Sequence, residues 1–318
     1  MFLREGAAMD RRFLFTILAG FLLVVLSTPA VLYAQDTGSA PLLRQRTDLV
    51  TVDVTVTDAR NRVIAGLGKS EFELYEDKVQ QQLEFFAVKD LPARVGIVFD
   101  ISSSMQLKLK KSLEALRAFI ATSHPDDNFL VVAFNQSPKL IADSTDGESV
   151  VARLSAQKTS GKTALYDAVY LGLERLQVET ARRKVMVVVT DGEDNNSRYS
   201  LRDVTRLATE ADVTIYFLSI TEAVESTCTR LCQMNARRAM EQIASKTGGT
   251  SFFPAFLDEM YSAAEKIALE IRGMYSLGYV PTNPERDGKW RRIRVQVREP
   301  GAKAKLNIRS RDGYFAGR

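Results

Sequence analysis

Three short polar stretches of the sequence could together hold a cation. Asp100, Ser102 and Ser104 form an Asp-x-Ser-x-Ser stretch, Thr163 stands in Gly-Lys-Thr-Ala-Leu, and Asp191 stands in Thr-Asp-Gly. Hydroxyl and carboxylate oxygens suit a hard ion such as Mg²⁺, which prefers an octahedron and usually keeps several waters. No cysteine or histidine occurs in these stretches, so zinc and copper are poor candidates. A helix N-cap cluster is the structural alternative for the serines, but it leaves Thr163 and Asp191 unexplained.

The surrounding sequence predicts that these stretches meet at one edge of a sheet. Residues 95–99 and 185–189 are continuous apolar runs, typical of strands that are buried on both faces. Asp100 and Asp191 follow these two strands, and Thr163 precedes a predicted helix. Loops that leave the carboxyl ends of parallel strands meet where the strand order reverses, and ligands bind there. We therefore expect the polar groups of all three stretches to converge.

The pattern from residue 91 to 273 predicts an α/β fold. Strands and helices alternate, which indicates a mostly parallel, Rossmann-like sheet with helices on both faces. Gly248-Gly249 predicts the end of a helix. The predicted strands are 95–99, 129–134, 185–189, 213–220 and 250–253, and the predicted helices are 107–120, 164–178, 201–211, 236–246 and 257–271.

The flanking segments predict β structure instead. Val50, Val52, Val54 and Val56 alternate with polar residues, as in a half-buried strand. Short strands are also predicted at 72–75, 82–88, 274–280, 293–297 and 306–308. We expect residues 45–90 and 274–318 to pair into one small all-β domain, with the α/β domain at 91–273 inserted in it.

The N-terminus predicts export from the cytoplasm. Arg11 and Arg12 precede an uncharged run from Phe13 to Ala34, in the order of a secretory signal peptide over residues 1–34. The same run is long enough to span a bilayer as an uncleaved anchor, which is the only membrane contact that we expect. With either outcome the folded part is secreted, periplasmic or in the cell envelope.

The two cysteines predict a disulfide, and the charge balance indicates which class of partner to expect. Cys228 and Cys232 are close in sequence, so in an oxidising compartment they predict a local disulfide. The chain has 43 basic and 39 acidic residues, a nearly even balance. We interpret the basic clusters at 108–111 and 290–294 as solvated faces of a helix and a strand, so no nucleic-acid partner is expected.

The three polar stretches, at 100–104, 161–165 and 190–192, resemble the metal-ion-dependent adhesion site of von Willebrand factor A domains. The resemblance covers about residues 93–272. The stretches 66–77 and 277–281 further resemble the "VWFA-related" proteins of Acidobacteria.

That resemblance implies a site for one Mg²⁺, or for Mn²⁺ or Ca²⁺. It implies direct ligation by Ser102 and Ser104, with Thr163 binding directly or through water. Asp100 and Asp191 would act mainly through water, and an Asp or Glu carboxylate of a partner protein would complete the shell. The function implied is cation-dependent adhesion or protein binding.

Two other functions stay open from the sequence. The first is a scaffold or assembly subunit of a cell-envelope complex, and the second, more remote, is a metal-dependent hydrolase. The single histidine, His124, lies in a predicted surface turn, and Gln157 occupies the place of the first glycine of a phosphate-binding loop. Glu193 and Asp194 could serve as a base, but we interpret them as a solvated acidic loop. We therefore expect no enzyme.

Overall fold

The computed structural model describes residues 49–88, 91–179, 181, 183–192, 194–220, 229–256, 258–298 and 306–317. The predicted signal peptide, with its alternative as a membrane anchor, lies outside these residues. Within the described ranges no helix is both long and apolar enough to cross a membrane. The predicted disulfide joins Cys232 to Cys228, which lies outside the described residues, so that pairing stays a prediction.

A six-stranded sheet forms the centre of the α/β part, in the order β10-β9-β8-β5-β6-β7. Neighbouring strands are parallel, except that β7 runs antiparallel to β6. This mostly parallel sheet confirms the predicted fold class. The strands are β5 (Arg94–Asp100), β6 (Asn128–Phe134), β7 (Pro138–Thr145), β8 (Lys184–Thr190), β9 (Thr214–Ser219) and β10 (Ser251–Phe252).

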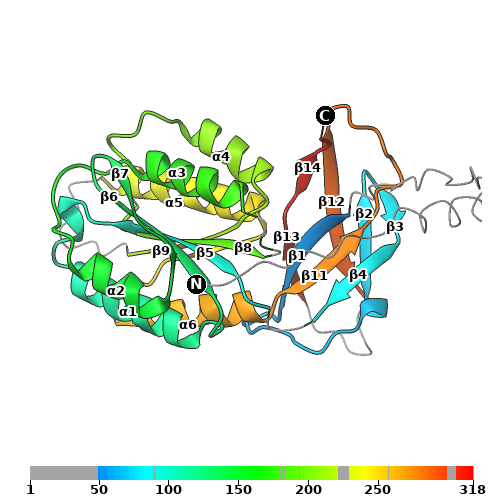
Figure 1. Ribbon diagram of the computed structural model, residues 1–318, viewed down its shortest axis with the longest axis horizontal. Helices are drawn as coiled ribbons and strands as arrows, with labels where there is room; N and C mark the ends of the chain where they lie inside the picture. The colour runs from blue at the N-terminus through cyan, green and yellow to red at the C-terminus, as the bar shows by residue number, and fades with distance from the viewer. Residues whose placement is uncertain are drawn as a thin grey trace, which may run out of the picture. The chain divides into compact units, whose positions relative to one another are not determined.

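Helices cover both faces of this sheet, with α1, α2 and α6 on one side and α3, α4 and α5 on the other (Figure 1). Side chains that alternate along β5 enter two separate apolar cores. Ile97 and Phe99 pack with the first group of helices, and Val98 packs with the second. The helices are α1 (Leu109–Thr122), α2 (Gly147–Ser155), α3 (Leu165–Gln177), α4 (Leu201–Glu210), α5 (Arg230–Lys246) and α6 (Glu259–Arg272).

The structure differs from the predictions at a few element boundaries. Helix α5 begins before the predicted residue 236, because the side chain of Thr229 caps it at the backbone N–H of Cys232. It ends as predicted, with Gly248 at a φ of +83°. A Cβ on Gly249 would lie 1.9 Å from the carbonyl oxygen of Ile215, so only glycine fits there. Strand β7 and helix α2 were not predicted.

The remaining strands form two antiparallel four-stranded sheets, β13-β1-β11-β4 and β14-β12-β2-β3. Both sheets contribute to one apolar core, which includes Val54, Leu74, Leu277 and Ile293. Chain segments before and after the α/β part are therefore paired, although the domain boundaries stay a prediction. The strands are β1 (Val50–Thr57), β2 (Phe72–Glu76), β3 (Val79–Gln81), β4 (Leu83–Ala87), β11 (Tyr275–Tyr279), β12 (Trp290–Val297), β13 (Asn307–Ser310) and β14 (Gly313–Phe315).

A buried arginine joins the end of α6 to the strand that follows it. Arg183 is 1% exposed and donates to the carbonyl oxygens of Ile271 and Met274, each at 3.0 Å. Burial raises the pKa of Asp53 above its usual value, and the charge of Arg183 opposes part of that rise. The guanidinium thus supplies a hydrogen bond to a carbonyl in the last turn of α6 and another to the carbonyl just before β11.

Candidate metal site

The loops at the carboxyl edge of the six-stranded sheet are hydrogen-bonded to one another. Strand β5 ends at Asp100, and the next residues contact the loop that precedes α3. The N–H of Ser160 donates to the Ile101 carbonyl at 2.9 Å, and the N–H of Ser103 donates to the Gly161 carbonyl at 3.1 Å. Gly161 adopts a φ of +79°, which glycine accommodates without strain. The first two predicted stretches are therefore in direct contact.

Asp100 is fully buried at the end of β5. Its Oδ1 accepts from the backbone N–H of Ser102 at 2.8 Å, and its Oδ2 accepts from the Thr190 hydroxyl at 2.7 Å. Burial raises the pKa of Asp100 from 3.8 to about 7, the charge of Asp191 adds to the rise, and the hydrogen bonds oppose it. The ionised carboxylate is thus under-compensated and would gain from a nearby positive charge.

The two serines present their hydroxyls together. The Oγ atoms of Ser102 and Ser104 lie 3.1 Å apart, with Ser102 buried and Ser104 exposed. Ser102 precedes a short 3₁₀ helix, η2 (Ser103–Met105), but its side chain makes no capping hydrogen bond. The helix-cap interpretation of these serines therefore does not account for the Ser102 hydroxyl.

Asp191 follows β8 and has two differently placed oxygens. Its side chain is 6% exposed, and Oδ2 accepts from the Lys108 ammonium at 3.1 Å. Oδ1 is buried and has no hydrogen-bond partner among the described residues. A buried carboxylate oxygen without a donor is costly, and a bound cation is a common reason for one. The prediction of a solvated helix face at 108–111 is therefore wrong for Lys108, whose side chain is only 15% exposed.

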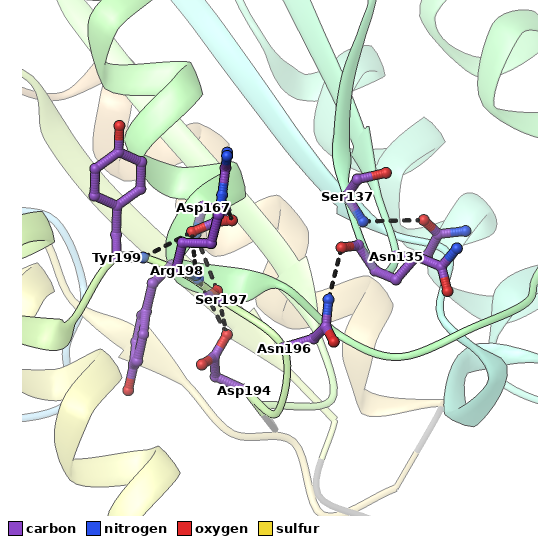
Figure 2. Close-up of polar contacts among 10 residues, drawn as sticks. Asn135, Ser137, Asp167, Asp194, Asn196, Ser197, Arg198 and Tyr199 are labelled. Atoms are coloured by element: carbon purple, nitrogen blue, oxygen red, sulfur yellow. Dashed lines mark hydrogen bonds and ion pairs between the residues drawn. The ribbon is translucent and has the colours of Figure 1, made fainter.

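Thr163 is held in place by the loop after β8. Its N–H donates to Asn195 Oδ1 at 3.0 Å, and its carbonyl accepts from the N–H groups of Asn195 and Asn196 at 3.0 and 3.1 Å. Asn196 also donates from its side chain to the Gln136 carbonyl at 2.9 Å (Figure 2). The sequence analysis missed Asn195, whose only signal is a run of turn-forming residues after Asp191.

The acidic loop after β8 is less solvated than the sequence analysis expected. Asp194 is partly buried and accepts from the Ser197 hydroxyl at 2.5 Å and from the Tyr166 N–H at 3.4 Å (Figure 2). It therefore stands at the first turn of α3, where a carboxylate is stabilising, and burial raises its pKa. The solvated-loop interpretation is wrong for Asp194, and Glu193 lies outside the described residues.

His124 is far from the serines along the strand direction. It precedes β6, whereas Ser102 and Ser104 follow β5, and these neighbouring strands are parallel. His124 Nδ1 accepts from the Asp126 N–H at 3.1 Å, as in a local turn. Because the histidine and the serines lie at opposite edges of the sheet, they do not form a nucleophile–base pair.

The donor set fits a hard divalent cation. Two carboxylates and three hydroxyls are present at this edge, and one oxygen of the Asp191 carboxylate has no hydrogen-bond partner among the described residues. Within the part of the chain that the structure describes, no group of three or more His, Cys, Asp and Glu could hold a metal. The hydroxyl and carboxylate oxygens at this edge are the donor types that a hard divalent cation binds.

The family model described as von Willebrand factor type A domain matches residues 95–263. The chain belongs to this family. The matched range of this A domain contains all five predicted ligands. No curated protein is similar enough to match. The proposed likeness to the "VWFA-related" proteins of Acidobacteria is not tested by these comparisons and stays a prediction.

Several solved structures are similar to this chain at low sequence identity. A von Willebrand factor type A protein from Catenulispora acidiphila is 13% identical, with a TM-score of 0.48, over 85% of this chain and 74% of that one. An aerotolerance-related membrane protein from Bacteroides fragilis is 18% identical, with a TM-score of 0.45, over 56% and 98%. Proximal thread matrix protein 1 from the mussel byssus, "with zinc occupied MIDAS motif", is 20% identical, with a TM-score of 0.45, over 60% and 48%.

Proposed function

We propose that this A domain is an exported, cation-dependent protein-binding module. One divalent ion, Mg²⁺ or alternatively Mn²⁺ or Ca²⁺, is held by five residues and in turn binds an Asp or Glu carboxylate of a partner protein. The five residues are Asp100, Ser102, Ser104, Thr163 and Asp191. The observation that carries the proposal is the pair of sheltered carboxylates, Asp100 and Asp191, of which Asp191 keeps one oxygen that has no donor among the described residues.

The five proposed ligands have two different roles in binding the ion. Ser102 and Ser104 offer neutral hydroxyls for direct ligation, and Thr163 offers a third. Asp100 and Asp191 supply negative charge, chiefly through water. A bound ion would keep enough Lewis acidity to attract an external carboxylate, because neutral ligands withdraw little of its charge. Asn195 and the Thr190 hydroxyl fix the orientation of Thr163 and Asp100.

The location and architecture of the protein are part of the proposal. The predicted signal peptide over 1–34 directs the chain to the periplasm, the cell envelope or the medium. Segments 45–90 and 274–318 form the small β-domain that carries the A domain at 91–273. Pairing of β1 with β11 and β13 supports that division. Catalysis has no support from the site, because the single histidine lies at the other edge of the sheet.

Calorimetric titration of the protein with Mg²⁺ and with Mn²⁺ tests the proposal. Saturable binding at one site is expected, and the variant Asp100→Asn should lose it while keeping the shape of the side chain. Asp126→Asn is the matched control, because that carboxylate is 80% exposed in the turn before β6. Absence of binding by the wild type, or equal binding by both variants, would contradict the proposed site.

A pull-down from envelope extract, with and without chelator, then separates adhesion from assembly. Recovery of extracellular material that depends on the cation supports adhesion to an external partner. Recovery of envelope proteins alone would replace adhesion with a role as an assembly subunit. Recovery that chelator leaves unchanged would contradict a cation-dependent interaction of either kind.

A further inference from the structure

Lys108 occupies a position in α1 that a lysine does not ordinarily favour. It is the N-cap residue of the helix, where Ser, Thr, Asp and Asn are preferred and where the helix dipole is positive. Its backbone is fixed, since its N–H donates to the Met105 carbonyl at 3.0 Å and its carbonyl accepts from the Ser112 N–H at 2.9 Å. Met105 is fully buried. A cation held at this helix terminus therefore needs a compensating partner.

That partner is Asp191, one of the proposed metal ligands. Lys108 Nζ lies 3.1 Å from Asp191 Oδ2, and the two side chains are only 15% and 6% exposed. A sheltered ion pair is screened less by salt than an exposed one. The two oxygens of Asp191 therefore differ, because Oδ2 accepts from the Lys108 ammonium and Oδ1 has no donor among the residues that the structure describes.

We propose that Lys108 is a built-in counter-charge that lowers the affinity of the site for the divalent ion and raises its affinity for a carboxylate. The proposal rests on the cation site proposed above. The ammonium repels an incoming cation and shares Asp191 with it. An ammonium has three N–H donors, so two remain for a carboxylate that binds beside the ion. The Lys108 side chain therefore weakens cation binding and strengthens carboxylate binding at the same site.

The proposal predicts opposite changes in two affinities. Lys108→Met removes the charge and keeps much of the length, so Mn²⁺ should bind about tenfold more tightly, as calorimetry would measure. Acetate should bind the Mn²⁺-loaded variant roughly threefold more weakly, as paramagnetic relaxation of its methyl protons would measure. A lysine with a purely structural role would lower both affinities together or leave both unchanged.

Three further variants complete the design. Lys110→Met removes an exposed lysine from the same helix and should leave both affinities at the wild-type value. Lys108→Arg keeps the charge and should also keep both affinities, and Lys108→Gln replaces Lys108→Met if the latter does not fold.

The outcomes separate this inference from the proposed function. Tighter Mn²⁺ binding with weaker acetate binding in Lys108→Met supports the inference. Wild-type Mn²⁺ binding that Lys108→Met leaves equal or weakens overturns the inference and keeps the cation site. If the wild type binds no Mn²⁺ but Lys108→Met does, the lysine prevents cation binding, and this outcome supports the inference that Lys108 lowers the affinity for the ion. If neither binds Mn²⁺, both the cation site and the inference fall.

Discussion

Replacing Asp100 by asparagine should stabilise the cation-free protein while it abolishes cation binding. The side chain is fully buried, and its pKa is raised to about 7 from 3.8. A carboxyl group whose pKa is raised by folding favours the folded state below its unfolded pKa. That contribution is lost as the pH rises through the folded pKa. At pH 8 the wild-type carboxylate is ionised, although burial and the charge of Asp191 disfavour its negative charge. Asparagine is neutral and avoids this unfavourable free energy.

The size of the effect follows from the difference between the two pKa values. Linkage converts a shift from 3.8 to about 7 into a cost of about 4 kcal/mol at pH 8 and about 2 kcal/mol at pH 5. Asparagine still accepts from the Ser102 N–H, but its amide nitrogen cannot accept from the Thr190 hydroxyl. Loss of that hydrogen bond lowers the expected stabilisation by about 1 kcal/mol. The net stabilisation should be about 3 kcal/mol at pH 8 and about 1 kcal/mol at pH 5.

Thermal unfolding with chelator at the two pH values measures this difference. At pH 8 the melting temperature of Asp100→Asn should exceed that of the wild type by roughly 6–12 °C, and the gap should shrink at pH 5. Added Mg²⁺ should raise the melting temperature of the wild type and leave that of the variant unchanged. A variant that is less stable than the wild type by the same amount at both pH values would refute the reasoning, because Asp100 would then be a satisfied structural residue.

Three more changes test other parts of the structure. Gly249→Ala sets a methyl group against a carbonyl oxygen 1.9 Å away and should cost more than about 3 kcal/mol in urea unfolding, whereas Gly317→Ala, with open space around it, should cost nothing measurable. Arg183→Met removes the donors to two buried carbonyls and should lower the free energy of unfolding by about 3–5 kcal/mol; an unchanged urea midpoint would show that the pairing is dispensable. Asn195→Ala releases Thr163 and should weaken Mg²⁺ binding about tenfold or more by calorimetry, and equal affinity would remove Thr163 from the ligand set.

The sequence predicts the central sheet well because its strands are long apolar runs. Strands β5, β8 and β9 are buried along nearly their whole length, and this requires cover on both faces. Strand β7 was missed because it is an edge strand that pairs only with β6, through an irregular register that breaks the alternation of side chains. Helix α2 is only nine residues long, and its clearest signal was the capping Asp146.

The candidate site could be predicted only where residues carry their own signal. The ligand types of Asp100, Ser102 and Asp191 are evident from the chain, since each follows a predicted strand. The ion pair between Lys108 and Asp191 joins residues 83 positions apart, and no local sequence pattern predicts a contact between residues so far apart in the chain. The clamp by Asn195 is hidden for the same reason, because a turn-forming asparagine is ordinarily interpreted as part of the loop itself.

The energetics of the site depend on two predicted residues, Asp100 and Asp191, and on Lys108, which was not predicted to take part. Asp100 and Asp191 raise each other's cost when both are ionised, because burial deprives their charges of water. Lys108 offsets part of that cost for Asp191, because its ammonium lies 3.1 Å from Asp191 Oδ2. Asp100 has hydroxyl and amide donors but no ion pair among the described residues, and its carboxylate is therefore the less compensated of the two. A cation that binds near both carboxylates offsets the unfavourable free energy of the buried, ionised Asp100. Asp100→Asn should therefore weaken cation binding and at the same time stabilise the cation-free fold.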